Sequence, residues 1–255
     1  MIGSYSKPLS QPALQDGKGM ERIAKRMARS GLCSRRDAEK WISQGRVIVN
    51  GTKLTSPATN VSDSCKIKVD GKLLGEPEGT RLWRYHKRVG FLTTHNDPQG
   101  RPNIFQTLPT TLPRVISIGR LDINSEGLLL LTNDGELARK MELPRTGLTR
   151  TYKARVYGLV KKSALAELKR GITVGKVHYG PIHAHLDRQV GANAWLSIAL
   201  KEGKNREIRH ALATINLRVN RLIRVSYGQF SLGSLAPGTL HEVIGMDKKL
   251  PYGSQ

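Results

Sequence analysis

The chain of 255 residues is strongly basic: 42 lysines and arginines stand against 20 aspartates and glutamates, which leaves a formal charge of +22 at pH 7. This excess favours a polyanionic partner, with nucleic acid as the first candidate. No apolar run reaches the roughly 18 residues of a membrane span, and the first residues lack the apolar segment of a secretion signal. We therefore expect a soluble, cytoplasmic protein that does not bind a membrane.

Two short helices are expected at the start of a small domain over residues 20–74. The first should begin near Glu21 and end at Gly31, because glycine readily adopts the left-handed conformation found at helix C-termini. The second should begin after Ser34, which has Asp37 three residues later and so matches a capping box. The dipeptides Asn50-Gly51 and Asp70-Gly71 lie between alternating apolar residues and predict two hairpins with type I′ turns.

The stretch "ARSGLCSRRDAEKWISQGRVIVNG", residues 28–51, resembles the S4 RNA-binding domain over its whole length. The resemblance implies that four arginines contact RNA phosphates: Arg29, Arg35, Arg36 and Arg46. The alternative is an ordinary solvated helix surface, which the overall charge excess disfavours.

A second, strand-rich domain is expected over residues 81–245, after the linker "GEPEGT" at 75–80. Short β-like runs alternate with turns, and helices are expected near 134–142, 161–170 and 205–215. This pattern predicts an α+β fold with a mainly antiparallel central sheet flanked by helices. Flexible tails are expected over 1–19 and 246–255.

Two stretches partly match motifs for binding a metal or a phosphate, but neither matches the whole motif. The stretch from Asp122 begins like a calcium-binding EF-hand loop, but Asn133 stands where a bidentate glutamate is needed. "GITVGKV" has the wrong spacing for a phosphate loop. Cys33 and Cys65 stand alone, so neither zinc nor a disulfide framework is indicated. We expect no metal and no cofactor.

The stretch "GRLDINSEGLLLLTNDGEL", residues 119–137, places Asp122 just before a block of leucines. Alone, it is compatible with a polar turn whose aspartate bonds backbone amides. The whole stretch, however, resembles the catalytic motif of the pseudouridine synthases, in the branch of ribosomal small-subunit pseudouridine synthase A and the large-subunit enzymes B, E and F. Glu126 departs from that pattern, in which a small residue is common.

Two further segments resemble motifs of the same family. "TRTYKARVYG" puts Tyr152 at the aromatic position, and "EGKNREIRHAL" puts Arg209 at the basic position. Alone, Tyr152 would be a sheet aromatic filling core space and Arg209 a charge at the edge of a helix face, where it would need a carboxylate partner. In "NRLIRVSYG" either Leu222 or Ile223 fits the aliphatic position of the uracil pocket; we prefer Leu222, and we place Arg120 of "GRLD" in the same pocket.

The resemblance implies that a uridine in RNA is isomerised to pseudouridine by breaking its N1–C1′ bond and rejoining the base through C5. Asp122 would act as the nucleophile or as a stabilising anion, and both roles stay open. Burial among leucines disfavours an ionised carboxylate, whereas a guanidinium from Arg209 within a few ångströms favours it. Tyr152 would stack on the flipped uracil, and its hydroxyl is a candidate proton shuttle.

The resemblance also implies ribosomal RNA as the partner, more specifically large-subunit RNA, bound by a monomer. Arg101 in "HNDPQGRPNIF" and the pair Lys204 and Arg206 are expected to contact that RNA. Two alternatives stay open: a non-catalytic RNA-binding or ribosome-assembly factor on the same scaffold, and the same chemistry on tRNA.

Overall fold

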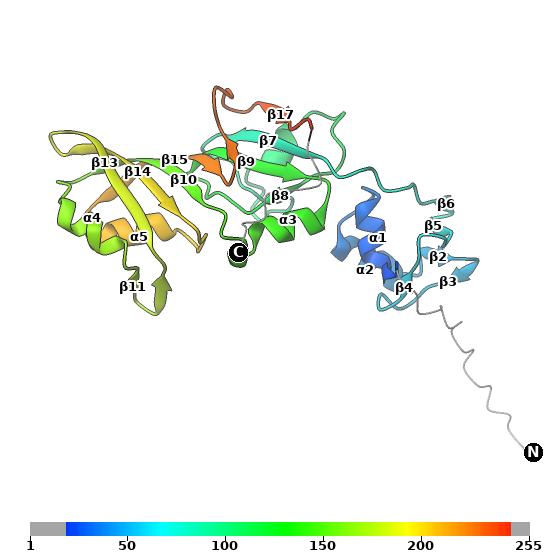
Figure 1. Cartoon of the computed structure of the whole chain (residues 1–255). Helices are drawn as coiled ribbons and strands as arrows, with labels where there is room; N and C mark the ends of the chain where they lie inside the picture. The colour runs from blue at the N-terminus through cyan, green and yellow to red at the C-terminus, as the bar shows by residue number, and fades with distance from the viewer. Residues whose placement is uncertain (1–18, 246–255) are drawn as a thin grey trace, which may run out of the picture. The chain divides into compact units, whose positions relative to one another are not determined.

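A computed structural model describes residues 19–245 of the chain. One unit ends at Gly79 and a second begins at Thr80 (Figure 1). The tails expected over 1–19 and 246–255 lie, apart from Gly19, outside the described residues. Within the described part, no helix is long and apolar enough to cross a membrane.

The first unit packs two helices on small antiparallel strands. Its core contains Ile23 and Met27 of the first helix, Ile42 of the second and Val47 of the sheet. Its elements are β1 (Glu21–Arg22), α1 (Ile23–Arg29), α2 (Arg35–Ser43), β2 (Val47–Val49), β3 (Thr52–Lys53), β4 (Asn60–Val61), β5 (Ile67–Val69) and β6 (Lys72–Leu73).

The local signals of the first unit are confirmed, with one correction. The N–H of Asp37 donates to Ser34 Oγ at 3.0 Å, and the N–H of Ser34 donates to the Asp37 carboxylate at 3.2 Å, which completes the capping box. Both hairpin dipeptides have positive φ at each residue, as type I′ turns require. The prediction that the first helix begins at Glu21 is wrong, because Glu21 and Arg22 pair with β4 and the helix starts at Ile23.

The second unit contains a nine-stranded sheet with the order β13-β14-β10-β15-β9-β7-β17, with β16 paired to β15 and β8 to β9. All its strand pairs are antiparallel except β15 with β9, so the predicted α+β class is confirmed. The elements are β7 (Leu82–Lys87), η1 (Ile104–Thr107), β8 (Ile116–Ile118), β9 (Glu126–Thr132), α3 (Gly135–Glu142), η2 (Pro144–Thr146), β10 (Arg150–Tyr157), α4 (Lys162–Leu168), β11 (Ile172–Val174), β12 (Val177–Tyr179), β13 (Ile182–Val190), β14 (Asn193–Leu200), α5 (Glu207–Thr214), β15 (Arg218–Tyr227), β16 (Phe230–Ser231) and β17 (Leu240–Glu242).

The edge strand β13 was not predicted from the sequence. Its outward side carries His183, His185 and Asp187, so its apolar alternation is weak. Its register on β14 shifts between Leu186 and Arg188, which marks a β-bulge.

The parallel pairing of β9 with β15 depends on Gly127. Glu126 and Gly127 lie beside Ile223 and Arg224, at the centre of the sheet. Gly127 has a φ of +102°, and a Cβ added there would lie 2.3 Å from the backbone oxygen of Arg224. Only glycine allows this backbone conformation together with this approach of the two strands.

The two faces of the sheet are covered by different helices. Figure 1 shows α4 and α5 near β13 and β14, and α3 near β8 and β9. Leu165 of α4 and Leu212 of α5 share a core with inward residues of β10 and β14, such as Ala154 and Leu196. Leu137 of α3 belongs to a separate core on the other side of β9 and β7. The sheet is therefore buried on one side near α4 and α5, and on the other side near α3.

We expect Gly127→Ala to lower the free energy of unfolding of the second unit by roughly 3 kcal/mol or more, because both the backbone conformation and the contact with Arg224 must change. Gly100→Ala is the matched control: Gly100 also has positive φ, but an added Cβ meets nothing within 4 Å. It should cost only roughly 1 kcal/mol. Urea unfolding of both variants measures the difference, and equal losses would show that the strand contact is unimportant.

Candidate active site

A cavity of about 800 Å³ opens in the second unit between the loop before β9, the strands β10 and β15, and the segment leading into α5. Every site residue predicted for the second domain lines it: Arg101, Arg120, Asp122, Tyr152, Lys204, Arg206, Arg209 and Leu222. These residues are spread over more than 100 positions of the chain, and the fold brings them together around one cavity.

Asp122 lies on the short loop between β8 and β9 and is half-buried. Gly119 begins the loop with a φ of +69°, and its N–H donates to Glu142 Oε1 at 2.6 Å. The N–H of Ser125 donates to the backbone oxygen of Asp122 at 3.0 Å, which closes a turn. The loop therefore has a defined shape, and among residues 19–245 no hydrogen bond to the Asp122 carboxylate is found.

Lys87 binds the backbone of this loop. The sequence did not lead us to expect it. Its side chain is fully buried, and its ammonium donates to the backbone oxygens of Arg88 at 3.0 Å, Asp122 at 3.1 Å and Ser125 at 2.8 Å. Burial lowers the pKa of Lys87 to about 8, although the negative charges of Asp122 and Glu126 oppose that shift. The available signal was the lysine that ends the strand-like run "RLWRYHK", since a lysine is rarely buried unless it is bonded.

Arg209 also binds the backbone of this loop, but its hydrogen-bond partners differ from the predicted one. Its guanidinium donates to the backbone oxygens of Val219 and Asn124, each at 2.9 Å, rather than to a carboxylate. The expectation of a direct carboxylate partner is therefore wrong, because the loop and the start of β15 offer carbonyls at the right distance. Burial and the nearby Arg206 lower the pKa of Arg209, whereas the charge of Asp122 raises it. An arginine side chain nevertheless stays charged at neutral pH.

Tyr152 and Leu222 enter the cavity from neighbouring strands. On β10, Tyr152 and Ala154 face inward, and they pair with Arg224 and Leu222 of β15. Tyr152 is 8% exposed and Leu222 6% exposed, and both line the cavity. Ile223, the other aliphatic candidate, packs against the core on the opposite side of the sheet.

A buried cationic wall backs the cavity, and the sequence reasoning missed it too. Arg150 donates to the Tyr227 hydroxyl at 2.7 Å, and that hydroxyl donates to the backbone oxygen of Met141 at 2.9 Å. Arg224 donates to the backbone oxygen of Leu128 at 2.7 Å. Both guanidinium groups lie over the Tyr227 ring, 4.6 and 5.2 Å from its centroid. Arg150 and Arg224 alternate in phase with Tyr152 and Leu222, which is the pattern that could have revealed them.

The basic residues at the rim differ in how they are bound. Arg101 forms a two-point pair with Asp97, at 2.7 and 3.1 Å, and this pairing lowers the pKa of Asp97 to about 2. Lys204 contacts Glu202 at 2.9 Å. Arg206 is exposed and has a positive φ of +49° just before α5, and Arg120 is exposed as well. Arg206 and Arg120 are thus the more available cations at this rim.

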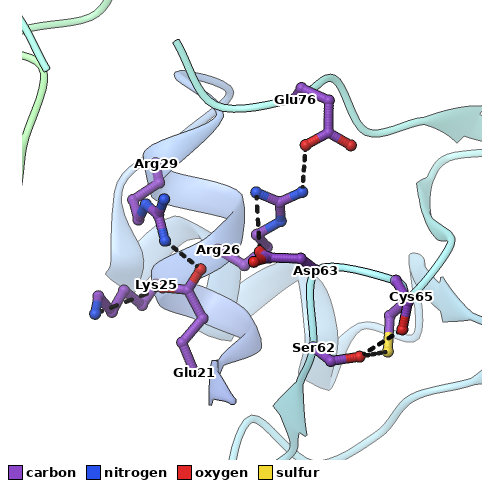
Figure 2. A network of polar contacts seen from close by, with 9 residues as sticks. Glu21, Lys25, Arg26, Arg29, Ser62, Asp63, Cys65 and Glu76 are labelled. Atoms are coloured by element: carbon purple, nitrogen blue, oxygen red, sulfur yellow. Dashed lines mark hydrogen bonds and ion pairs between the residues drawn. The ribbon is translucent and has the colours of Figure 1, made fainter. Parts of the chain in front are cut away.

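The four arginines predicted to bind RNA in the first unit are likewise unequal. Arg29 donates to Glu21 at 2.7 Å (Figure 2), and Arg46 forms a two-point pair with Asp70 at 2.9 and 2.5 Å. Arg35 and Arg36 are exposed at the start of α2. These two arginines therefore offer the freest positive charge of the four.

Comparison with known proteins gives consistent matches. A family model described as RNA pseudouridylate synthase matches residues 81–214, and an S4 domain model matches residues 21–64. A Rickettsia felis protein described as an uncharacterized RNA pseudouridine synthase is 48% identical over 88% of this chain and 97% of its own length. Ribosomal large subunit pseudouridine synthase B of Pasteurella multocida is 39% identical over 91% of this chain and 68% of its own. A solved pseudouridylate synthase structure superposes with a TM-score of 0.61, at 26% identity over 87% of this chain and 95% of that one.

Lys87 is expected to make stability depend on pH in a defined direction. Its pKa is about 8 in the folded chain and near 10.5 in an unfolded one, so between these values the unfolded chain holds a proton that the folded chain has lost. Raising the pH through this window therefore favours folding, by about 1.4 kcal/mol per pH unit. Urea unfolding from about pH 7 to about pH 10.5 should show this gain in the wild type relative to Lys87→Met.

The control for that measurement is Lys140→Met, which removes an exposed lysine of α3. It should follow the wild type at every pH. If Lys87→Met also ran parallel to the wild type, Lys87 would titrate like an ordinary surface lysine and the inferred desolvation would be wrong.

Proposed function

Because the chain belongs to the RNA pseudouridylate synthase family, we propose that it isomerises a uridine of ribosomal RNA to pseudouridine, with Asp122 as the reacting carboxylate. The observation that carries this proposal is the cavity in which Asp122, Tyr152, Arg209 and Leu222 meet. The large-subunit RNA is the favoured substrate, because the relative from Pasteurella multocida is named as a large-subunit enzyme. The proposed enzyme acts as a monomer in the cytoplasm.

The setting of Asp122 suits a carboxylate that is held in a fixed position beside the substrate. Lys87 and Arg209 both interact electrostatically with it, and both clamp the backbone of its loop through carbonyl oxygens. Positive charge attracts the carboxylate, and a fixed loop keeps it aimed at one point. In the proposed reaction this anion attacks or stabilises the substrate while the N1–C1′ bond breaks, a C5–C1′ bond forms, the C5 proton leaves and N1 gains one.

The other cavity residues suit a detached base that must turn. The Tyr152 ring offers a flat surface on which uracil can rotate without losing contact, and Leu222 adds an apolar wall from the next strand. A cavity of about 800 Å³ is within the range that holds a small ligand. A nucleotide can enter only after leaving its stack, at a cost of a few kcal/mol that contacts to the phosphates must offset.

The first unit is proposed to bind the RNA and to take no part in the isomerisation. It matches the S4 domain model over residues 21–64, and Arg35 and Arg36 stand exposed at the start of α2. The second unit, from Thr80 onward, is proposed to hold all the reacting groups. A non-catalytic binding factor would not need the buried arrangement of Asp122, Lys87 and Arg209.

We expect Asp122→Asn to abolish turnover, with RNA affinity nearly unchanged, because the cations that contact phosphates lie elsewhere. Release of tritium from 5-tritiated uridine in ribosomal RNA measures turnover, and filter binding measures affinity. Asp97→Asn is the matched control, since Asp97 lines the same cavity but pairs with Arg101 at the rim. The Asp97→Asn variant should still isomerise uridine at saturating RNA. Full turnover by Asp122→Asn would remove Asp122 from the mechanism.

We expect the double variant Arg35→Gln, Arg36→Gln to bind RNA more weakly and with a flatter salt dependence. Each lost phosphate contact should reduce the slope of log affinity against log salt by roughly 0.9 for duplex RNA, taking duplex DNA as the guide. Turnover at saturating RNA should change little. A control that removes Lys161 and Lys162, exposed residues at the start of α4, should keep the slope. An unchanged slope in the arginine variant would exclude α2 from the RNA contact.

A further inference from the structure

The strands that line the cavity also have an outward side. On β10, Tyr152 and Ala154 face the cavity and its core, so Arg155 and Tyr157 alternate to the opposite side. On β14, Leu196 faces the core and Trp195 faces outward, where it is half-buried. We call this outward side of β13, β14, β10 and β15 the open face.

The open face is accessible to solvent. Tyr157 is 49% exposed, and Arg155, Arg188 and Arg218 are exposed as well. The helices α4 and α5 contribute their apolar residues to the core on the other side, and α3 packs against β8 and β9. A tryptophan and a tyrosine thus stand on a sheet surface that the protein has not used for its own core.

Strand register arranges the open face into two rows. The first row crosses four strands in the order Arg188, Trp195, Arg155 and Arg221. Neighbouring strands are about 4.8 Å apart, so an arginine flanks the indole ring on each side at roughly that spacing. In the next row Arg218 lies opposite Tyr157, with its guanidinium 5.4 Å from the ring centroid.

The charge of this row is only partly balanced by the protein. Arg221 pairs with Glu126, but within the described part of the chain no acidic partner is found for Arg155 or Arg188. Arginines directly opposite on neighbouring strands repel, and Arg155 faces Arg221. A polyanion lying along the row would relieve that repulsion, whereas an apolar protein surface would bury the arginines without partners.

We propose that the open face binds a single-stranded stretch of the substrate RNA, with a base stacked on Trp195 and phosphates at Arg155 and Arg188. Aromatic rings set among cations on a sheet are well suited to single strands, whose bases are free to stack. Because the cavity opens on the other side of the same strands, this stretch is distinct from the nucleotide that enters the cavity. The inference rests on the proposed function only for the choice of RNA.

The test measures binding of the full chain to a single-stranded oligoadenylate of on the order of 10 nucleotides, which contains no uridine for the cavity. The double variant Arg155→Gln, Arg188→Gln should flatten the salt slope by about 0.7 for each lost contact, or about 1.4 in total. The control Lys161→Gln, Lys162→Gln removes the same charge from exposed positions on α4 and should leave the slope unchanged. Equal slopes for both double variants would overturn the proposal.

Stacking is tested separately at Trp195. Trp195→Leu should weaken oligoadenylate binding about five-fold or more, whereas Trp195→Phe keeps a ring and should lose much less. Duplex RNA hides its bases, so Trp195→Leu should bind it like the wild type. Equal losses for the Leu and Phe variants would overturn the stacking contact.

These outcomes distinguish a failure of the open-face proposal from a failure of the proposed reaction. Asp122→Asn without loss of turnover would refute the reaction and leave the binding result standing. An active enzyme whose oligoadenylate binding does not change on substitution of Arg155, Arg188 and Trp195 would refute RNA binding by the open face alone.

Discussion

The close approach of β9 and β15 at Gly127 is the constraint on which the site depends. It places the end of the Asp122 loop beside the strand that carries Leu222 and Arg224, almost 100 positions later in the chain. The same approach lets Arg209 reach the carbonyl of Asn124. A side chain at position 127 would push the strands apart and separate the carboxylate from the wall it faces.

Neutral oxygens rather than acids bind the buried cations in and beneath the cavity wall, unlike the rim cations Arg101 and Lys204, which pair with acids. Lys87, Arg209 and Arg224 all donate to main-chain oxygens, and Arg150 donates to the hydroxyl of Tyr227. Carbonyls bind these groups without neutralising them, so the wall keeps its positive potential where an anionic backbone or a reacting carboxylate must lie. Three of these four cations are arginines, which stay charged on burial, whereas the pKa of the lysine falls to about 8.

Sequence patterns predicted local structure well, and failed where partners come from distant segments. Ser34 and Asp37 form the capping box they predict, and the cavity gathers the residues of three separate motifs. Lys87 was missed because only the fold shows that it ends beneath the Asp122 loop. Arg46 was expected to be available to RNA, but Asp70 engages it, a pairing that strand register creates between two hairpins. Charge can be counted in a sequence, but its neutralisation depends on tertiary contacts.

The bulge in β13 has a consequence for the behaviour of the protein at high concentration. An unpaired edge strand can recruit the same strand of another molecule and so extend the sheet into an aggregate. On β13 the shifted register between Leu186 and Arg188 and the carboxylate of Asp187 interrupt the regular edge. At the opposite edge, β17 offers only three residues. Both edges of the sheet thus discourage edge-to-edge pairing with another molecule.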